Sequence, residues 1–245
     1  IVLGAIIAPL TGLFLARRAM QPIDAAFAAQ RAFVADASHE LRTPLAVLRA
    51  NAEMLERVPD LTEEDVRAEA RNLVSEVDEI ARLVDDLIFL AQADEHAPGL
   101  IQLAPVDLSA AVSAEVSAQR HRASLAGQTL NEEIAGGIAV SGDLNRLRQA
   151  LRTLIDNAIH YTPSGGKISV SLTREGNQAV VRVHNTGEGI ADDDLRRIFD
   201  RFYRSSNARG QRGGGGGLGL AIAKTIVEAH EGTISAESRP KTGAT

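Results

Sequence analysis

Apolar residues recur near the start of the chain at three- and four-residue steps or at sums of these steps, which is the spacing of a helix with one buried face. The repeating residues are Phe27, Val34, Leu41, Leu45, Leu48 and Leu55. They predict a first long helix over about residues 22–57. Pro44 lies inside this helix, where proline removes a backbone donor and clashes with the preceding turn. We therefore expect a bend just after His39.

A second helix is predicted to follow a turn near Pro59. Thr62 precedes Glu63, Glu64 and Asp65, which is typical of a helix N-cap with acidic residues in the first turn. The apolar residues that follow alternate four- and three-residue steps, as in a heptad seam. They are Val66, Ala70, Leu73, Val77, Ile80, Val84, Leu87 and Ala91. The two helices should form an antiparallel hairpin.

A single hairpin has too little surface to bury the apolar faces of both helices. Pairing with a second copy into a four-helix bundle would cover them. We therefore expect a homodimer. The alternative is a monomeric helix pair that the rest of the chain covers.

The pattern changes after Asp94. Residues 94–104 contain Pro98-Gly99 and little periodicity, which predicts a linker. Beyond it, helical patterns occupy residues 108–125, 144–159 and 218–230, and strand-like runs occupy residues 129–134, 138–141, 167–172, 179–184 and 233–237. Strands that run mostly as hairpins with helices on one side predict an α+β sandwich.

The first sixteen residues carry no charge and are followed directly by Arg17 and Arg18. This run is shorter than the roughly 20 residues that span a bilayer, but the chain begins with Ile1 and not with methionine. We expect residues 1–18 to be the end of a transmembrane helix, with the paired arginines on the cytoplasmic side. A signal-peptide core or a buried helix is the alternative, although a signal peptide carries its positive charge before the apolar run.

Composition narrows the possible partners. The net charge of −6 arises from 26 basic and 32 acidic residues without a basic block, so a nucleic-acid surface is not indicated. The absence of cysteine excludes disulfides and thiolate metal sites and fits a reducing compartment. We divide the chain into residues 1–18 (membrane helix end), 19–95 (hairpin), 96–104 (linker) and 105–245 (second domain).

His39 is flanked by Glu40 and followed by Thr43. An imidazole can attack phosphorus through one ring nitrogen when a carboxylate accepts a proton or hydrogen bond from the other. The Thr43 hydroxyl lies one helical turn further on the same face, where it could orient water for the reverse reaction. A histidine on a charged helix is more often a solvated residue, so the His-Glu pair alone does not identify a nucleophile.

The longer string Ser-His-Glu-Leu-Arg-Thr-Pro-Leu, residues 38–45, resembles the phosphoacceptor box of bacterial sensor histidine kinases of two-component systems. The resemblance covers almost the whole chain. It implies that His39 accepts phosphate, that Glu40 is its base, and that Thr43 serves phosphatase activity toward a response regulator. Residues 17–30 are too short for the HAMP relay that many relatives carry.

The run Leu154-Ile-Asp-Asn-Ala-Ile-His-Tyr-Thr-Pro163 resembles the N box of the same family. An asparagine oxygen is a hard neutral ligand suited to magnesium. The resemblance implies that Asn157 binds Mg2+, that His160 reaches the phosphates of ATP, and that Tyr161 packs near the base. Thr153 stands where relatives often have another asparagine, and His160 stands where lysine is usual.

Three further segments resemble the remaining nucleotide boxes. Residues 183–190 resemble the first glycine box. In this box Asn185 stands where relatives mostly have an aspartate that binds adenine. An asparagine side chain still accepts a hydrogen bond, but it carries no charge. Residues 198–204 resemble the aromatic lid box, and the glycine run at 213–219 resembles the second glycine box, whose backbone amides can hold phosphates. The implied nucleotide-binding residues here are Asn185, Gly187, Gly189, Ile190, Phe199, Phe202, Arg204, Gly215, Gly217, Leu218, Gly219 and Leu220.

The resemblance implies a helical hairpin that forms a dimeric four-helix bundle, followed by an α/β sandwich of the GHKL ATPase type. It predicts an ATP- and magnesium-dependent autokinase of the bacterial inner membrane, with its catalytic parts in the cytoplasm. A response-regulator aspartate would receive the phosphoryl group from His39. A dimeric membrane adaptor that binds no nucleotide is one alternative, and a gyrase-like or chaperone-like ATPase is another.

Overall fold

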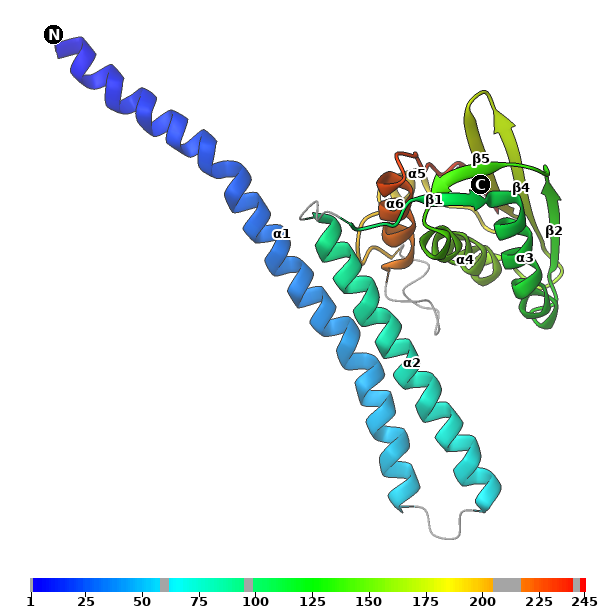
Figure 1. Cartoon of the computed structure of the whole chain (residues 1–245). Coiled ribbons are helices and arrows are strands. Elements are labelled where there is room, and N and C mark those ends of the chain that lie inside the picture. Colours follow the sequence, from blue (N-terminus) through cyan, green and yellow to red (C-terminus); the bar gives the residue numbers. More distant parts are fainter. Residues whose placement is uncertain (1, 58–61, 95–98, 205–216, 240–242) are drawn as a thin grey trace. The chain divides into compact units, whose positions relative to one another are not determined.

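The computed structural model describes residues 2–57, 62–94, 99–204, 217–239 and 243–245. The chain divides into two compact units, Ile1–Leu87 and Ile88–Thr245 (Figure 1). Within the described residues, no helix is both long and apolar enough to cross a membrane.

Two long helices make up the first unit. Helix α1 comprises Val2–Arg57 and helix α2 comprises Glu63–Asp94, with the end of α2 extending into the second unit. The start of α1 differs from the expected position near residue 22. The helix also runs uninterrupted through Pro22 and Pro44, because each proline removes only one backbone bond from a helix that keeps its other bonds. The bend after His39 stays a prediction.

The start of α2 confirms the predicted N-cap. The Thr62 hydroxyl oxygen accepts a hydrogen bond from the backbone N–H of Asp65 at 3.1 Å, and the Asp65 carboxylate accepts one from the backbone N–H of Thr62 at 3.1 Å. The Thr62 hydroxyl also donates to this carboxylate, which lowers the pKa of Asp65. These reciprocal bonds satisfy two backbone donors that a helix end otherwise leaves unpaired.

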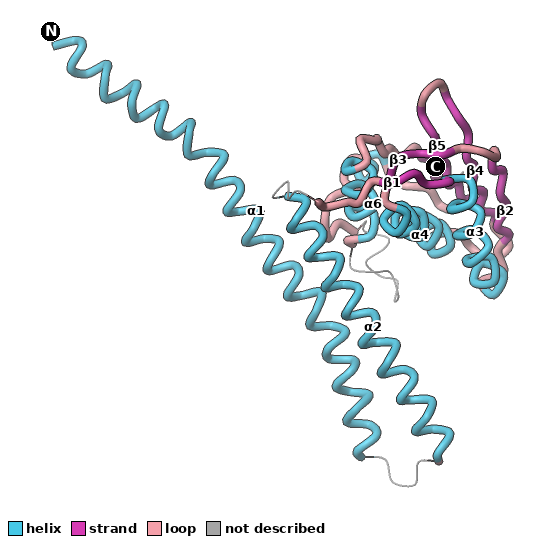
Figure 2. The backbone as a smooth tube through the Cα atoms, in the orientation of Figure 1, coloured by secondary structure: helices cyan, strands magenta, loops and turns pink. Residues whose placement is uncertain are grey.

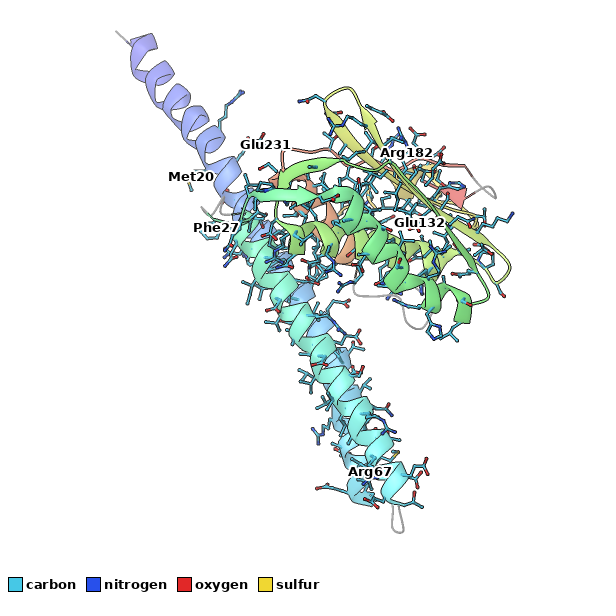
Figure 3. The ribbon with its side chains drawn as sticks, turned by 45° about the vertical axis from the view of Figure 1, so that its right-hand side comes forward. Met20, Phe27, Arg67, Glu132, Arg182 and Glu231 are labelled. Carbon is cyan, nitrogen blue, oxygen red and sulfur yellow. The ribbon has the colours of Figure 1, made fainter. Side chains whose placement is uncertain are left out.

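The apolar residues of the hairpin differ in how much of their surface is exposed. Leu41 and Leu48 on α1 and Leu73 and Ile80 on α2 are half-buried. The seam residues of the other heptad column on α2 are more exposed, with 52% for Val77 and 38% for Val84. Phe27 on α1 is likewise exposed (Figure 3). The protomer therefore buries one side of its seam and leaves the other side accessible.

The second unit contains two sheets. Strands β2 (Thr129–Ile134), β4 (Lys167–Glu175), β5 (Gln178–Asn185), β7 (Gly243–Ala244) and β6 (Ser238–Arg239) form a five-stranded sheet in the order β2-β4-β5-β7-β6. The pair β2–β4 is parallel, whereas β4–β5 and the remaining pairs are antiparallel. Strands β1 (Ala104–Asp107) and β3 (Ala139–Gly142) form a separate antiparallel pair.

Three helices gather on one side of the larger sheet: α3 (Leu108–Leu125), α4 (Leu144–Tyr161) and α6 (Gly219–Ala229) (Figure 2). A short helix α5 comprises Asp192–Leu195. Alternate residues of β4, namely Ile168, Val170 and Leu172, are fully buried, and they pack in one cluster with Val112, Val116 and Ile155 of the helices. The sheet therefore has one face in the core, as the strand pattern predicted.

Two strand assignments from the sequence need correction. The strand expected at residues 233–237 is wrong, because the chain there is irregular and the extended pair occurs later, at Ser238–Arg239. Strand β1 lies at the end of the expected linker and pairs along its length with β3. Strand β1 was missed because a strand needs a hydrogen-bonding partner, and its partner β3 follows α3 and β2 in the chain. Ser238–Arg239 instead pairs with the nearby Gly243–Ala244.

Asp143 joins three segments at the start of α4. Its Oδ1 accepts hydrogen bonds from the backbone N–H groups of Asn145 and Arg146 at 3.0 and 3.2 Å, which caps the helix. Its Oδ2 accepts from the N–H of Gln102 at 3.1 Å. Its own N–H donates to Nε2 of His230, at the end of α6, at 2.9 Å. Burial raises the pKa of Asp143, but these N–H groups and the charge of Arg146 outweigh it, so the pKa lies below its usual value.

The final turns of α2 belong to the second unit and are held there by two contacts. Phe89 is buried, and the guanidinium of Arg146 lies 4.1 Å from the centre of its ring. Asp94 accepts two hydrogen bonds from Arg201, both at 2.6 Å. A bidentate pair restricts orientation as well as distance, so residues 88–94 are fixed to the segment that follows α5.

Replacing Asp143 with alanine should lower the free energy of unfolding by about 1–2 kcal/mol, because α4 loses its N-cap. Asp143→Asn keeps an acceptor and should lose less. Urea unfolding of the full-length chain, followed by circular dichroism, measures both values. Equal stability of wild type and Asp143→Ala would contradict the capping role.

The effect of Asp143→Ala should depend on pH. Because the folded-state pKa of Asp143 is lowered, its carboxylate stabilises the fold fully above the usual aspartate pKa of about 3.9. That contribution is lost as the pH falls through the lower folded-state value. The difference in unfolding free energy between wild type and Asp143→Ala should therefore be constant from about pH 7 to pH 5 and shrink below about pH 4.

Candidate nucleotide-binding and phosphoacceptor sites

The proposed acceptor, His39, is an exposed residue of α1. Thr43 is also exposed and follows one turn later, whereas Glu40 is half-buried. The adjacent Ser38 hydroxyl donates to the carbonyl of Val34 at 2.7 Å, within the helix. A helix thus presents the imidazole and the hydroxyl on one accessible face, as the sequence predicted. His39 lies in the first unit, and the predicted nucleotide residues lie in the second.

Asn157 lies on α4 with a defined orientation. Its Nδ2 donates to the backbone carbonyl of Thr153 at 2.9 Å, which leaves Oδ1 as the group available to a ligand. A Cβ placed on Gly219 would lie 3.0 Å from the Thr153 methyl group, so the start of α6 packs closely against this turn of α4. The methyl group of Thr153 therefore lies in the contact between α4 and the start of α6.

The neighbouring aspartate has a different role from that of Asn157. Asp156 forms an ion pair with Arg122 of α3 at 2.6 Å. Burial raises the pKa of Asp156, although the charges of Arg122 and Arg152 act in the opposite direction. Arg152 in turn pairs at 3.0 Å with the buried Glu115 of α3. These groups join α3 to α4 and thereby support the helix that carries Asn157.

His160 and Tyr161 complete the last turn of α4. Their rings meet edge to face, with centroids 4.7 Å apart and an interplanar angle of 89°. Tyr161 is 44% exposed, so its ring is accessible to a planar ligand. Nε2 of His160 is buried and has no hydrogen-bond partner among the described residues. A phosphate oxygen is one group that could satisfy this nitrogen.

The loop after β5 approaches this turn closely. A Cβ on Gly187 would lie 2.5 Å from the carbonyl oxygen of Tyr161 and 3.0 Å from Nδ2 of Asn185. Only glycine allows the two backbones to come so near. Further along, Gly189 has a φ of +78°, and the N–H of Ile190 donates to the Ser238 hydroxyl at 2.7 Å. The structure therefore brings Asn185 and Gly187 together with Tyr161.

The aromatic lid box and the second glycine box also meet. Phe202 has a φ of +58° and Gly217 a φ of +71°. A Cβ on Gly217 would lie 2.7 Å from the backbone carbonyl carbon of Phe202. The hydroxyl of the next residue, Tyr203, donates to Asp194 at 2.5 Å. These contacts fix the segment before residue 205 against the start of α6.

The remaining predicted residues have varied positions. Phe199, Arg204, Gly219 and Leu220 are half-buried, whereas Leu218 is buried at the start of α6. Gly215 lies outside the described residues. The sequence reasoning missed Ser238, which accepts a hydrogen bond from the predicted residue Ile190, and Asp194, which accepts one from Tyr203, the residue after the predicted Phe202. No local signal would have found either residue.

The residues present fit a nucleotide with a magnesium ion. Asn157 offers an amide oxygen of the kind that magnesium accepts, His160 offers a buried nitrogen without a partner, and Tyr161 offers an accessible aromatic ring. No group of three histidine, aspartate or glutamate side chains in the described residues could hold a metal ion. A single amide oxygen suits a metal that keeps water and phosphate oxygens as its other ligands.

Two family models match the chain. The model of the His Kinase A phosphoacceptor domain matches residues 29–96. The model of the histidine kinase-, DNA gyrase B- and HSP90-like ATPases matches residues 142–245. The first range contains His39, and the second contains the predicted nucleotide-binding residues around α4.

Individual proteins agree with these matches. The signal transduction histidine-protein kinase BaeS of Escherichia coli K12 is 40% identical over 211 residues, which are 86% of this chain and 44% of BaeS. The chain thus spans less than half of this relative.

Among solved structures, the Acinetobacter baumannii histidine kinase AdeS matches with a TM-score of 0.66 and 26% identity, covering 84% of this chain and 94% of AdeS. Full-length ShkA in complex with AMPPNP matches with a TM-score of 0.63 and 28% identity, covering 84% of this chain and 42% of ShkA.

The hairpin with an exposed histidine, the one-sided sheet with its nucleotide residues, and both family matches lead to the same conclusion. The chain belongs to the sensor histidine kinases of two-component systems, a family of ATP-dependent protein-histidine kinases.

Proposed function

We propose that this chain binds ATP with magnesium in its second unit, transfers the γ-phosphoryl group to His39, and passes it to an aspartate of a response regulator. The observation that carries the proposal is the arrangement of Asn157, Tyr161 and Gly187 around the end of α4, in a chain with an accessible His39-Glu40 pair. The AMPPNP complex of the similar kinase ShkA supports the choice of nucleotide.

In this proposal each residue has a separate task. Asn157 supplies Oδ1 to the magnesium ion, because its Nδ2 is already bound to Thr153. Tyr161 covers the base, and His160 lies where its buried Nε2 can donate to a phosphate oxygen. Phosphoryl transfer depends mainly on position and on charge stabilisation, so these residues need to hold the nucleotide more than to react with it.

At the acceptor, Glu40 raises the nucleophilicity of His39 by accepting a proton or a hydrogen bond from the imidazole. The accessible Thr43 hydroxyl is placed one turn away. There it could orient a water molecule on a bound, phosphorylated regulator, which would make the protein a phosphatase as well as a kinase.

The protein should act as a homodimer. The accessible seam residues Val77 and Val84 of the hairpin are apolar and lie one heptad apart. A second copy would bury them in a four-helix bundle. The match to the His Kinase A domain over residues 29–96 supports this assembly.

We also propose attachment to the inner membrane through the uncharged residues 1–16, with Arg17 and Arg18 on the cytoplasmic side. The basis for this proposal is the charge pattern of the sequence alone. The catalytic parts would then lie in the cytoplasm, where ATP and a response regulator are available.

The acceptor assignment predicts that γ-labelled ATP will label the wild type with acid-labile phosphate and will not label His39→Gln. The matched control is His121→Gln, because His121 is an exposed histidine of α3 in the other unit. It should be labelled as the wild type is. Undiminished label on His39→Gln would overturn the acceptor assignment, and no label on the wild type would favour a dimeric adaptor without catalysis.

Replacing Asn185 with aspartate should strengthen ATP binding by about three- to tenfold, because a charged acceptor makes a stronger hydrogen bond than an amide oxygen. Calorimetric titration with magnesium and ATP measures this change. Asn131→Asp is the control, since Asn131 is exposed on β2 and the added charge is the same. If Asn185→Asp and the wild type bound ATP with equal affinity, Asn185 would have no role in recognising the base.

The dimer should be lost when Val77 is replaced with glutamate, because the bundle core would then contain a charge without a partner. Size-exclusion chromatography with light scattering should report the monomer mass for Val77→Glu and the dimer mass for Ser75→Glu. Ser75 is an exposed polar residue of the same helix. A dimeric Val77→Glu would show that the seam is not the interface.

A further inference from the structure

Gln128 lies between α3 and β2, in a tight turn that follows Gly127, whose φ is +70°. Backbone hydrogen bonds hold this turn to the end of α3 and to the loop after α4. The N–H of Gln128 donates to the carbonyl of Ala123 at 2.9 Å. Gly127 accepts from the N–H of Gly165 at 2.8 Å, and Thr129 donates to the carbonyl of Gly166 at 3.0 Å. The backbone of Gln128 is therefore fixed to the loop that follows α4.

The side chain of Gln128 extends to the C-terminus of α4. Its Nε2 donates to the carbonyl of Ile159 at 2.8 Å and to that of Thr162 at 2.5 Å. The last carbonyls of a helix have no partner within the helix, so Gln128 caps α4 from outside. The Thr162 hydroxyl satisfies a third such group, the carbonyl of Ala158, at 2.6 Å.

The burial of Gln128 shows that these two bonds matter. Only 9% of its surface is exposed, and its Oε1 is buried without a hydrogen-bond partner among the described residues. Burying an amide with one end unsatisfied is unfavourable. An apolar residue would avoid this cost, so the amide is useful here for its two N–H donors.

The two carbonyls that Gln128 binds flank His160 and Tyr161. The carbonyl of Tyr161 is the group against which Gly187 packs, beside Asn185. Any displacement of this last helical turn would shift the Tyr161 ring and the loop of Asn185 relative to each other. The side chain of Gln128 donates to the backbone carbonyls of Ile159 and Thr162, so its influence on Tyr161 and Asn185 would pass through the backbone at the end of α4.

We infer that Gln128 is a positioning residue of the nucleotide site, which holds the end of α4 so that Tyr161 and the Asn185 loop form one base-binding surface. The inference rests on the proposed ATP-binding function. It assigns to a buried glutamine outside all the nucleotide boxes a share in the affinity for ATP. Asn157, which is further from the end of the helix, keeps its own bond to Thr153, so transfer from bound ATP should be little affected.

The test compares Gln128→Glu with Gln119→Glu in the full-length chain. The first change is isosteric and removes both donors. The second places the same group at another buried glutamine, on α3 and also 9% exposed. Gln128→Glu should raise the KM for ATP and its calorimetric Kd about tenfold, the equivalent of roughly one hydrogen bond, with kcat at saturating ATP within about twofold. Gln119→Glu should change thermal stability and leave the KM unchanged.

If the carboxylate of Gln128→Glu prevents folding, Gln128→Met replaces it as the test variant. Methionine is similar in size to glutamine, lacks the two N–H donors and does not repel the two carbonyl groups. Amide hydrogen exchange gives a readout that does not need ATP: protection should fall in residues 158–166 of the Gln128 variants and not in Gln119→Glu. Unchanged protection and unchanged KM in a folded Gln128 variant would overturn the inference. A wild type that binds no ATP would instead overturn the proposed function, while the exchange data would still decide whether Gln128 positions α4.

Discussion

Helix α4 has to be held at both ends, and the rest of the second unit depends on this constraint. A helix leaves backbone donors unpaired at its start and acceptors unpaired at its end. Asp143 satisfies the donors at the start and also binds Gln102. Gln128 satisfies acceptors at the end. The helix between them carries Asn157, whose position relative to the nucleotide loops is thereby set from two distant parts of the chain.

Close backbone contact is the second requirement of the site. Gly187 meets the carbonyl of Tyr161, Gly217 meets the backbone of Phe202, and Gly219 meets the side chain of Thr153. A side chain at any of these glycines would separate two segments that share a function. The glycines thus act less by flexibility than by allowing approach. The same contact explains why threonine at 153 is compatible with the fold.

The first unit follows a different physical rule. Leu41 and Leu73 are half-buried on one side of the seam, while Val77 and Val84 stay accessible. This unequal burial is typical of a hairpin that is half of a bundle. It also leaves His39 on an accessible surface, which suits its proposed role as an acceptor that meets a donor site and a partner protein.

Much of the architecture could be predicted because it follows from local patterns. The helix Leu108–Leu125 and the strand Thr129–Ile134 occur at the predicted bounds, since apolar periodicity and turn residues specify them within one segment. The strand expected at residues 233–237 and the missed strand β1 show the limit. Strand β1 depends on its partner β3, which follows α3 and β2 in the chain. Near the C-terminus, β6 pairs with the adjacent β7, and β7 in turn pairs with the distant β5.

The same division holds for the site. The sequence alone determined the types of element, the heptad seam, and, through its resemblance to a known family, the candidate residues His39, Asn157 and Asn185. Only the tertiary structure showed how they are supported. The bonds from Gln128 to α4 and from Ser238 to Ile190 join positions that are distant in the sequence. Such bonds leave no periodic or local signal, because folding brings their atoms together only after the separate elements have packed.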